Sequence, residues 1–252
     1  VDSVNDGMDR SAWPRNRLLR VVQYAEALAI LAGEHRQRRT RAWSLDCEAF
    51  YRMVGRQRRE LWRNAMFLPN GVQLDERCCF GDASAATKCA RASNLIVKAV
   101  RAALQAFDEE HPTRDPAWAD WQSRRRAAAA VCGEEASEWA ALHWFGMYVD
   151  DGLGGSADDL LFNVDGVAVF TSLGEQQRRA AAHYDVVRCV LQRFGWDSAT
   201  SKELPPCLCL TALGVDIDLL DGRLRLEAGK RLRYAAAVES ALAARLVSAK
   251  AY

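Results

Sequence analysis

Two adjacent carboxylates, Asp150 and Asp151, stand between an apolar run and a glycine-containing segment. The run covers residues 140–149 and Gly152 follows the acids, a pattern that predicts a β-hairpin with the aspartates at its tip. Neighbouring like charges repel, so the arrangement costs stability unless a cation lies between them. Mg²⁺ or Mn²⁺, hard ions that prefer oxygen ligands, would suit the pair. The alternative is a solvated Asp-Asp-Gly turn, because both residue types are common in turns.

A third carboxylate, Asp46, ends an earlier short segment, residues 42–46, that is typical of a strand. Three acidic side chains that converge at the ends of neighbouring strands would form a two-metal site, because a sheet holds its strand ends rigidly. Asp46 could also cap the helix that residues 47–54 are expected to form. Both roles stay open, since capping and metal ligation use different lone pairs.

Gly81 lies in a segment of small residues that leads into a long predicted helix at about 83–107. A glycine allows a ligand to approach the backbone closely, and the N-terminus of a helix can hold a phosphate. A glycine that serves only packing is the alternative.

Other elements are expected from apolar periodicity and from turn residues. They are helices at 15–33, 174–194 and 227–247, strands at 60–68, 72–74, 208–219 and 223–226, and a polar insertion at 108–138 with a helix between two loops.

The composition is that of an ordinary globular protein. The chain has 252 residues, 50% hydrophobic and 27% charged, which allows one large domain or two small ones. The net charge of +1 gives no global basic field, although basic residues cluster at 36–41, 56–63 and 124–126. No apolar run has membrane-spanning length and no signal peptide is visible, so we expect an intracellular protein, cytoplasmic or nuclear. The first residue is Val, which predicts a fragment of a longer protein, and nothing in the sequence indicates an oligomeric state.

The cysteines argue against a zinc site. The chain has 8 of them and no C-x-x-C pair, and its 4 histidines have no ligand spacing to them. We expect reduced, mostly buried thiols.

The order of the motifs resembles the palm of a reverse transcriptase, with the nearest likeness to retroelement enzymes of the DIRS type. The resemblance runs from about residue 2 to residue 247. Its motifs, in chain order, are Leu45 to Arg52, Gly71 with Asp75 and Phe80 to Ala85, Tyr148 to Asp151, Gly195 with Ser201 and Lys202, and Leu213 to Ile217.

The resemblance implies an α+β fold, a polymerase palm with an antiparallel sheet of about four strands backed by helices. It divides the chain into a partial fingers region at 1–41, a palm at 42–219 that includes the insertion, and the start of a truncated thumb at 220–252.

The resemblance also implies an RNA-directed DNA polymerase, which extends the 3′-hydroxyl of a primer on an RNA or DNA template with dNTPs. Asp46 and Asp150 would bind two Mg²⁺ ions, or Mn²⁺ in their place, with Asp151 in support and the backbone carbonyl of Cys47 as a further ligand. Lys202 would protonate the leaving pyrophosphate; a solvated surface lysine is the alternative.

Further residues would contact the nucleotide and the template. Tyr51 would lie under the sugar and crowd a 2′-hydroxyl, with an ordinary core aromatic as the alternative. Phe80 and Gly81 would pack against the nucleotide and the template. The basic clusters at 36–41 and 56–63 would contact backbone phosphates.

Two residues depart from the family pattern. Asp82 adds a negative charge near the expected phosphate path, and Ala86 stands where relatives place a proline. They support an alternative of another class: a decayed or domesticated palm that binds nucleic acid or a partner without catalysis. The intact Asp46, Asp150 and Asp151 favour the polymerase. A third hypothesis is an unrelated α/β protein, in which Asp46 would lie far from Asp150.

Overall fold

The computed structural model describes residues 21–33, 40–50, 54–55, 65–74, 77 and 85–244. The helices are α1 (Val21–Ala32), α3 (Ala85–Glu110), α4 (Pro116–Cys132), α5 (Ala136–Trp139), α6 (Arg179–Arg193) and α7 (Ala228–Ala244), with a 3₁₀ turn, η3, at Thr200–Lys202. The strands are β1 (Thr40–Asp46), β2 (Ala65–Leu68), β3 (Gly71–Leu74), β4 (His143–Tyr148), β5 (Asp151–Ala157), β6 (Leu204–Cys207), β7 (Cys209–Ala212), β8 (Val215–Asp218) and β9 (Arg223–Leu226).

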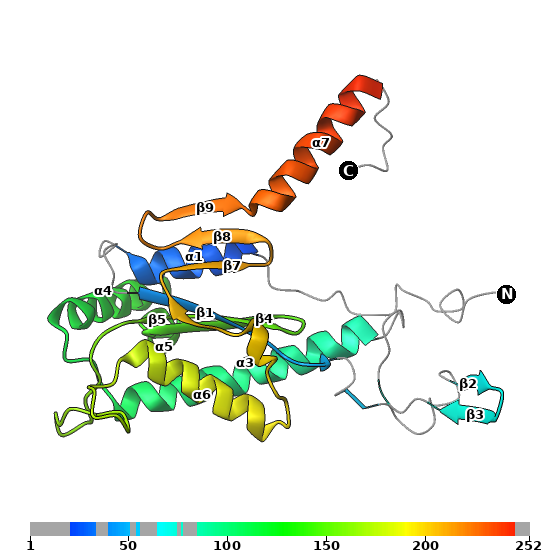
Figure 1. The fold of residues 1–252 in the computed structure, drawn as a ribbon. Coiled ribbons are helices and arrows are strands. Elements are labelled where there is room, and N and C mark those ends of the chain that lie inside the picture. The colour runs from blue at the N-terminus through cyan, green and yellow to red at the C-terminus, as the bar shows by residue number, and fades with distance from the viewer. Residues whose placement is uncertain are drawn as a thin grey trace.

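A four-stranded sheet in the order β4-β5-β1-β6 forms the centre of the molecule (Figure 1). Each neighbouring pair in it is antiparallel. The predicted α+β fold, with an antiparallel sheet of about four strands backed by helices, is therefore confirmed.

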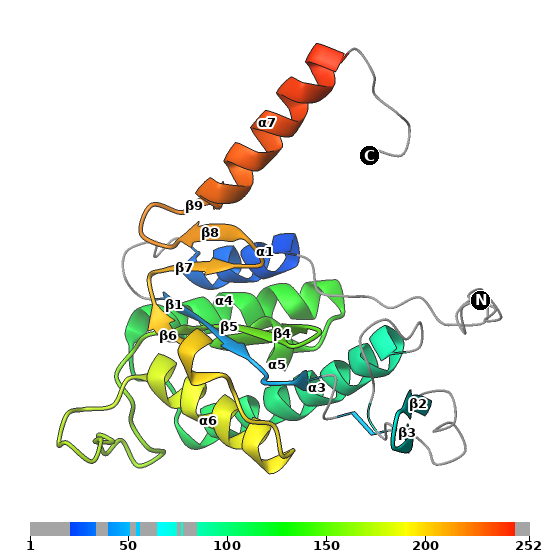
Figure 2. The ribbon, with the colours of Figure 1, turned by 45° about the vertical axis from the view of Figure 1, so that its right-hand side comes forward.

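Helices and strands cover both faces of this sheet. Trp43 and Leu45 on one face pack with α3 and α6 in the main core. Ala42 and Leu153 on the other face pack with α1 and with strands β7 and β8. In Figures 1 and 2, α3 and α6 lie below the sheet, whereas α1 and the strands β7 to β9 lie above it. Because both faces are buried, β1 is apolar at successive positions and does not alternate strictly.

The last part of the chain forms a separate three-stranded sheet, β7-β8-β9, followed by α7. Leu213 and Gly214, in the turn from β7 to β8, have φ values of 51° and 75°. Positive φ at both central residues is the signature of a tight hairpin turn whose twist matches the strands. Helix α7 points away from the main sheet in both views (Figures 1 and 2).

The segment predicted to be an insertion contains a long, well-capped helix that belongs to the core. The side chain of Asp115 accepts a hydrogen bond from the backbone N–H of Ala117 at 2.9 Å, and Gly133 ends α4 with a φ of 69°. Trp118 and Trp121 on α4 are buried in one hydrophobic cluster with Leu142. An Asp-Pro start and a Gly stop are capping signals that the sequence displayed.

Several predicted boundaries shift. The helix expected to begin at 174 begins at Arg179, because residues 160–178 form short antiparallel bridges instead. The strand predicted at 60–68 is described only as β2, since residues 60–64 lie outside the described part. The prediction of mostly buried thiols is wrong for Cys132, Cys189 and Cys209, which are exposed. Within the described residues, the helices lack the combined length and apolarity needed to cross a bilayer.

Gly154 on β5 gives the first prediction. It lies opposite Trp43, which is 0% exposed, and a Cβ at Gly154 would lie 2.3 Å from the indole Cε2 and Nε1 atoms. We expect Gly154→Ala to lower the free energy of unfolding by about 1–3 kcal/mol, the range for overpacking a core. Urea unfolding followed by Trp fluorescence measures it. The control, Gly229→Ala at an exposed position of α7, should be neutral or stabilising.

Candidate active site

The sheet register brings the three predicted carboxylates to one end of the sheet. Asp46 ends β1 and pairs directly with Asp151, the first residue of β5. The backbone N–H of Cys47 donates to the carbonyl of Asp150 at 3.0 Å. Residues at opposed positions of an antiparallel pair have side chains on the same face. Asp46 therefore lies beside the Asp150–Asp151 pair, which is the opposite of what an unrelated protein with an accidental turn predicts.

The turn that carries Asp150 is strained. Tyr148 pairs with Asp151 across a two-residue loop, so the predicted hairpin with aspartates at its tip is confirmed. Val149, the first loop residue, has a φ of 57°, a conformation that is disfavoured for a β-branched residue. Its side chain is only 9% exposed in the main core, and its carbonyl accepts a hydrogen bond of 2.6 Å from Ser93.

Lys202 reaches the same end of the sheet from η3. Its Nζ lies 2.5 Å from Oδ2 of Asp46. The segment before it is fixed to the end of β1, because the N–H of Ala199 donates to the carbonyl of Asp46 at 2.8 Å. The residue after it, Glu203, accepts a hydrogen bond from the Tyr184 hydroxyl at 3.0 Å. These bonds fix the segment on either side of Lys202 beside the end of β1, within reach of Asp46.

The acidic cluster shifts the pKa values of its members. Partial burial, and then the charges of Asp150 and Asp46, raise the pKa of Asp151 to about 6, although Lys202 opposes the shift. Burial, followed by the charges of Asp150, Asp46 and Asp151, raises the pKa of the Cys47 thiol to about 12. The thiol therefore stays protonated at neutral pH, and Cys47 would ligate a metal only through its backbone carbonyl.

The raised pKa of Asp151 predicts a pH dependence of stability without metal. Between about pH 4 and pH 6 the folded chain binds a proton at Asp151 that the unfolded chain has released. Stability should therefore fall as pH rises through this window and stay lowered above it. Asp151→Asn should remove this component, measured as the difference in urea midpoint between variant and wild type from pH 4 to pH 7. An equal pH profile in both chains would contradict the assignment.

The donor set suits a hard divalent cation. Three carboxylates offer the oxygen ligands that Mg²⁺ prefers, and Lys202 shows that a positive group is accepted beside Asp46. The three aspartates are not among the side-chain groups of the described residues whose ligand atoms lie close enough together to hold one ion. The predicted nucleotide contacts Tyr51, Phe80 and Gly81 lie outside the described residues, and their roles stay predictions.

The group of described residues that does meet this requirement consists of Asp108, His143 and His183. The two oxygens of Asp108 lie 2.9 Å from His143 Nδ1 and 3.0 Å from His183 Nε2. The set could hold a metal ion by distance, which the sequence prediction missed because the histidines lack ligand spacing. However, the guanidinium of Arg179 donates to Asp108 at 2.5 Å and would repel a second cation there.

The electrostatics of this cluster are those of a buried ion network. Burial lowers the pKa of His183. Burial alone would raise the pKa of Asp108, yet His183 and His143 hold it well below its usual range. Ser156 Oγ lies 2.7 Å from His183 Nδ1, so serine, histidine and aspartate stand in series. Ser156 is 0% exposed, however, and no substrate could reach it as a nucleophile.

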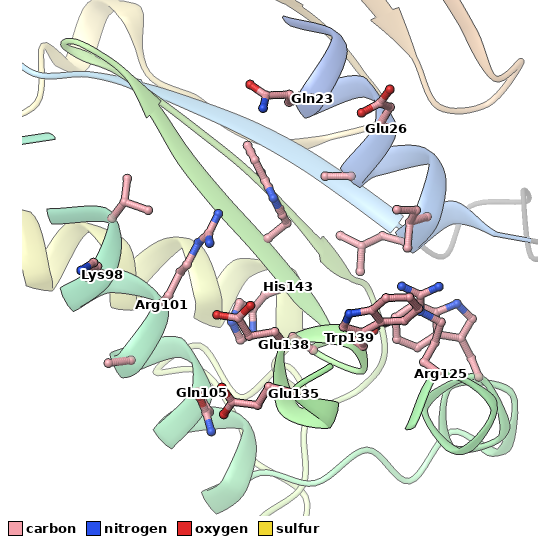
Figure 3. A pocket seen from close by; sticks show the side chains of 18 residues that line it. Gln23, Glu26, Lys98, Arg101, Gln105, Arg125, Glu135, Glu138, Trp139 and His143 are labelled. Carbon is pink, nitrogen blue, oxygen red and sulfur yellow. Dashed lines mark hydrogen bonds between the residues drawn. The ribbon is translucent and has the colours of Figure 1, made fainter. Parts of the chain in front are cut away.

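A hollow of about 710 Å³ lies elsewhere, between α1, α3, α4, α5 and β4 (Figure 3). The guanidinium of Arg125 stacks on Trp139 at 4.6 Å from the ring centroid, and Arg101 donates to the Phe145 carbonyl at 2.9 Å. In Figure 3 the carboxylates of Glu135 and Glu138 point toward α3, the helix that carries Arg101. The hollow thus mixes both charges, includes none of the three aspartates, and is distinct from the candidate active site.

No protein-family model matches the sequence. A search of curated proteins finds no significant match. Among solved structures, the chain is similar to the foamy viral protease-reverse transcriptase in complex with an RNA/DNA hybrid, with 12% identity and a TM-score of 0.46 over 86% of this chain and 20% of that one. It is also similar to the foamy viral protease-reverse transcriptase in complex with dsDNA, with 13% identity and a TM-score of 0.45 over 91% of this chain and 33% of that one. The chain therefore spans about a fifth to a third of the length of these proteins.

Proposed function

We propose that the chain is the palm of an RNA-directed DNA polymerase from a retroelement of the DIRS type. The observation that carries the proposal is the pairing of Asp46 with Asp151, together with the bond from Cys47 N–H to the Asp150 carbonyl. It joins a carboxylate from the end of β1 to the pair at the tip of the β4–β5 hairpin. That convergence is what two-metal nucleotidyl transfer requires.

In this proposal the residues of the cluster have separate tasks. Two Mg²⁺ ions, when bound, would lower the pKa of the primer 3′-hydroxyl and offset the charge of the leaving pyrophosphate. Asp46 and Asp150 hold the ions and Asp151 supports them. Lys202, whose ammonium group lies at Asp46, would pass a proton to the pyrophosphate.

The nucleic acid and the nucleotide would be held by other parts of the chain. Tyr51, Phe80 and Gly81 would contact the incoming dNTP, and the basic residues at 36–41 and 56–63 would contact the phosphates of an RNA or DNA template and its primer. The domain limits at 41 and 219 belong to the same proposal, with β7 and β8 as the hairpin that faces the primer.

Primer extension tests the proposal. The chain, a labelled DNA primer on an RNA template, dNTPs and Mg²⁺ should give extended products that EDTA abolishes. Asp150→Asn should remove the products, whereas Asp165→Asn, at an exposed position between β5 and α6, should leave them unchanged. Equal extension by Asp150→Asn and the control would overturn the assigned role.

The ion pair between Lys202 and Asp46 favours a second candidate, a palm that binds nucleic acid or a partner without catalysis. The ammonium group neutralises part of the acidic cluster without any metal. A Mg²⁺ titration separates the two functions. In a catalytic palm the wild type should bind Mg²⁺ more tightly than Asp150→Asn does. In a decayed palm the two chains should have the same Mg²⁺ affinity.

A further inference from the structure

Ser93 stands out among the buried polar side chains, because its hydroxyl reaches out of its own helix to the strained turn. It lies on α3 and is 3% exposed. Its Oγ lies 2.6 Å from the Val149 carbonyl and 2.9 Å from the Cys89 carbonyl. The hydroxyl has one proton, the Val149 oxygen is the nearer acceptor, and the Cys89 carbonyl already accepts an N–H within the helix.

Two hydrogen bonds from different elements hold the peptide groups on both sides of Asp150. The peptide group before Asp150 is held through the Val149 carbonyl by Ser93 of α3. The peptide group after it is held through the Asp150 carbonyl by the N–H of Cys47, at 3.0 Å. Fixing both groups fixes φ and ψ of Asp150, and therefore the direction of the Cα–Cβ bond on which its carboxylate is carried.

The peptide group before Asp150 belongs to a strained turn, and the hydrogen bond from Ser93 stabilises it. Val149 has a φ of 57°, and a non-glycine residue in this region is disfavoured by about 1–3 kcal/mol. Relief of this strain requires φ of Val149 to change, which turns the Val149 carbonyl about the N–Cα bond and away from Ser93. The hydroxyl therefore selects the strained form of the turn.

We propose that Ser93 is a positioning residue for the metal-binding carboxylates, and that its hydrogen bond to the Val149 carbonyl sets the direction of the Asp150 side chain. The inference rests on the proposed function in that it takes Asp150 as a metal ligand. Metal sites need their ligands held within about 0.5 Å. Loss of a group that orients a ligand typically weakens metal binding 10–100-fold.

The test measures Mn²⁺ affinity by calorimetry on the whole chain, with Mn²⁺ as a probe for Mg²⁺. Ser93→Ala should weaken Mn²⁺ binding at least about tenfold. Ser93→Cys has a weaker donor, so its Mn²⁺ affinity should lie between those of Ser93→Ala and the wild type. This variant replaces Ser93→Ala in the test if the alanine variant fails to fold. Ser123→Ala is the matched control, because Ser123 makes the same bond to a carbonyl four residues back but is exposed on α4. It should bind Mn²⁺ as the wild type does.

A role limited to stability would lower the melting temperature and leave the metal affinity unchanged. A second readout compares the effect of Ser93→Ala on Mn²⁺ affinity in the wild type with its effect in a Val149→Gly variant. Glycine adopts a positive φ without strain, and Ser93→Ala should therefore weaken Mn²⁺ binding less in that background than in the wild type. Equal weakening of Mn²⁺ binding in both backgrounds would overturn the proposal. The proposal would also fail if Ser93→Ala bound Mn²⁺ as tightly as the wild type does, or if the wild type bound no Mn²⁺.

These results separate the inference from the proposed function. If Ser93→Ala weakens Mn²⁺ binding but the wild type extends no primer, the positioning role stands and the polymerase assignment fails. If the wild type extends primers and Ser93→Ala retains both affinity and rate, the positioning role alone fails.

Discussion

Asp46→Asn should reduce the rate of nucleotide addition at least about 1,000-fold, because a metal ion supplies several kcal/mol of transition-state stabilisation and each 1.36 kcal/mol is a factor of ten. Asparagine keeps the size of the side chain and removes its charge, so the backbone bond from Ala199 to residue 46 should persist. The measurement is single-turnover primer extension at saturating Mg²⁺.

The same substitution should not destabilise the chain. Asp46 lies directly opposite Asp151, and like charges at such positions are destabilising. Its charge also contributes to the raised pKa of Asp151, which should fall in the variant. Loss of the exposed ion pair with Lys202 should have little effect on stability, because water and salt screen such a pair. We expect two results together: primer extension is abolished, and the melting temperature of the variant in EDTA equals or exceeds that of the wild type.

The Asp165→Asn variant is again the control, since it removes one carboxylate from an exposed position. An Asp46→Asn chain that extends primers at the control rate would contradict the two-metal assignment. A large fall in melting temperature would show instead that the carboxylate has a structural role, such as the helix cap that the sequence also allowed.

The convergence of the three aspartates could be predicted because Asp46 and Asp151 stand at strand ends and Asp150 lies in the turn beside them. An apolar run fixes the strand, and the position of the acid then fixes the edge of the sheet at which it lies. Position along the strand was therefore sufficient for Asp46, Asp150 and Asp151. The strained φ of Val149 could not be predicted, because it depends on burial of the side chain and on a bond from a serine 56 residues away.

The network around Asp108 was missed for a physical reason. Its members lie on α3, β4 and α6, and only Arg179 and His183 have a helical spacing that places them on one face. Side chains brought together by packing of different elements leave no local pattern. The long helix α4 was different: Asp115, Pro116 and Gly133 displayed its limits, but the polar composition of the segment concealed the two buried tryptophans.

Arg179→Met should produce the largest loss of stability, about 3–5 kcal/mol, the cost of removing one partner from a buried ion pair. Arg179 is 0% exposed. Its guanidinium donates to Asp159 at 2.7 and 3.1 Å and to Asp108 at 2.5 Å. Methionine fills much of the same volume but leaves two carboxylates without their shared cation. Urea unfolding at pH 7 measures the change.

Arg178 provides a matched control one residue earlier. Its side chain is 55% exposed and pairs with Asp158 at 3.1 Å, and Arg41 pairs with the same carboxylate. Arg178→Gln should therefore cost about 1 kcal/mol or less. Equal losses in the two variants would show that Arg179 contributes only as a surface charge does.

The pH dependence of Arg179→Met distinguishes lost charge from lost packing. The charge of Arg179 opposes protonation of His183, whereas Asp108 favours it, so the variant should raise the pKa of this histidine. Burial keeps the pKa of His183 below its ordinary value of about 6.5, so protonation destabilises the fold as pH falls through that value. The variant, with the smaller shift, should lose less stability there than the wild type, and the difference in stability between the two chains should shrink between pH 7 and pH 5. A loss that is constant over this range would mean that packing, and not the uncompensated carboxylates, carries the effect.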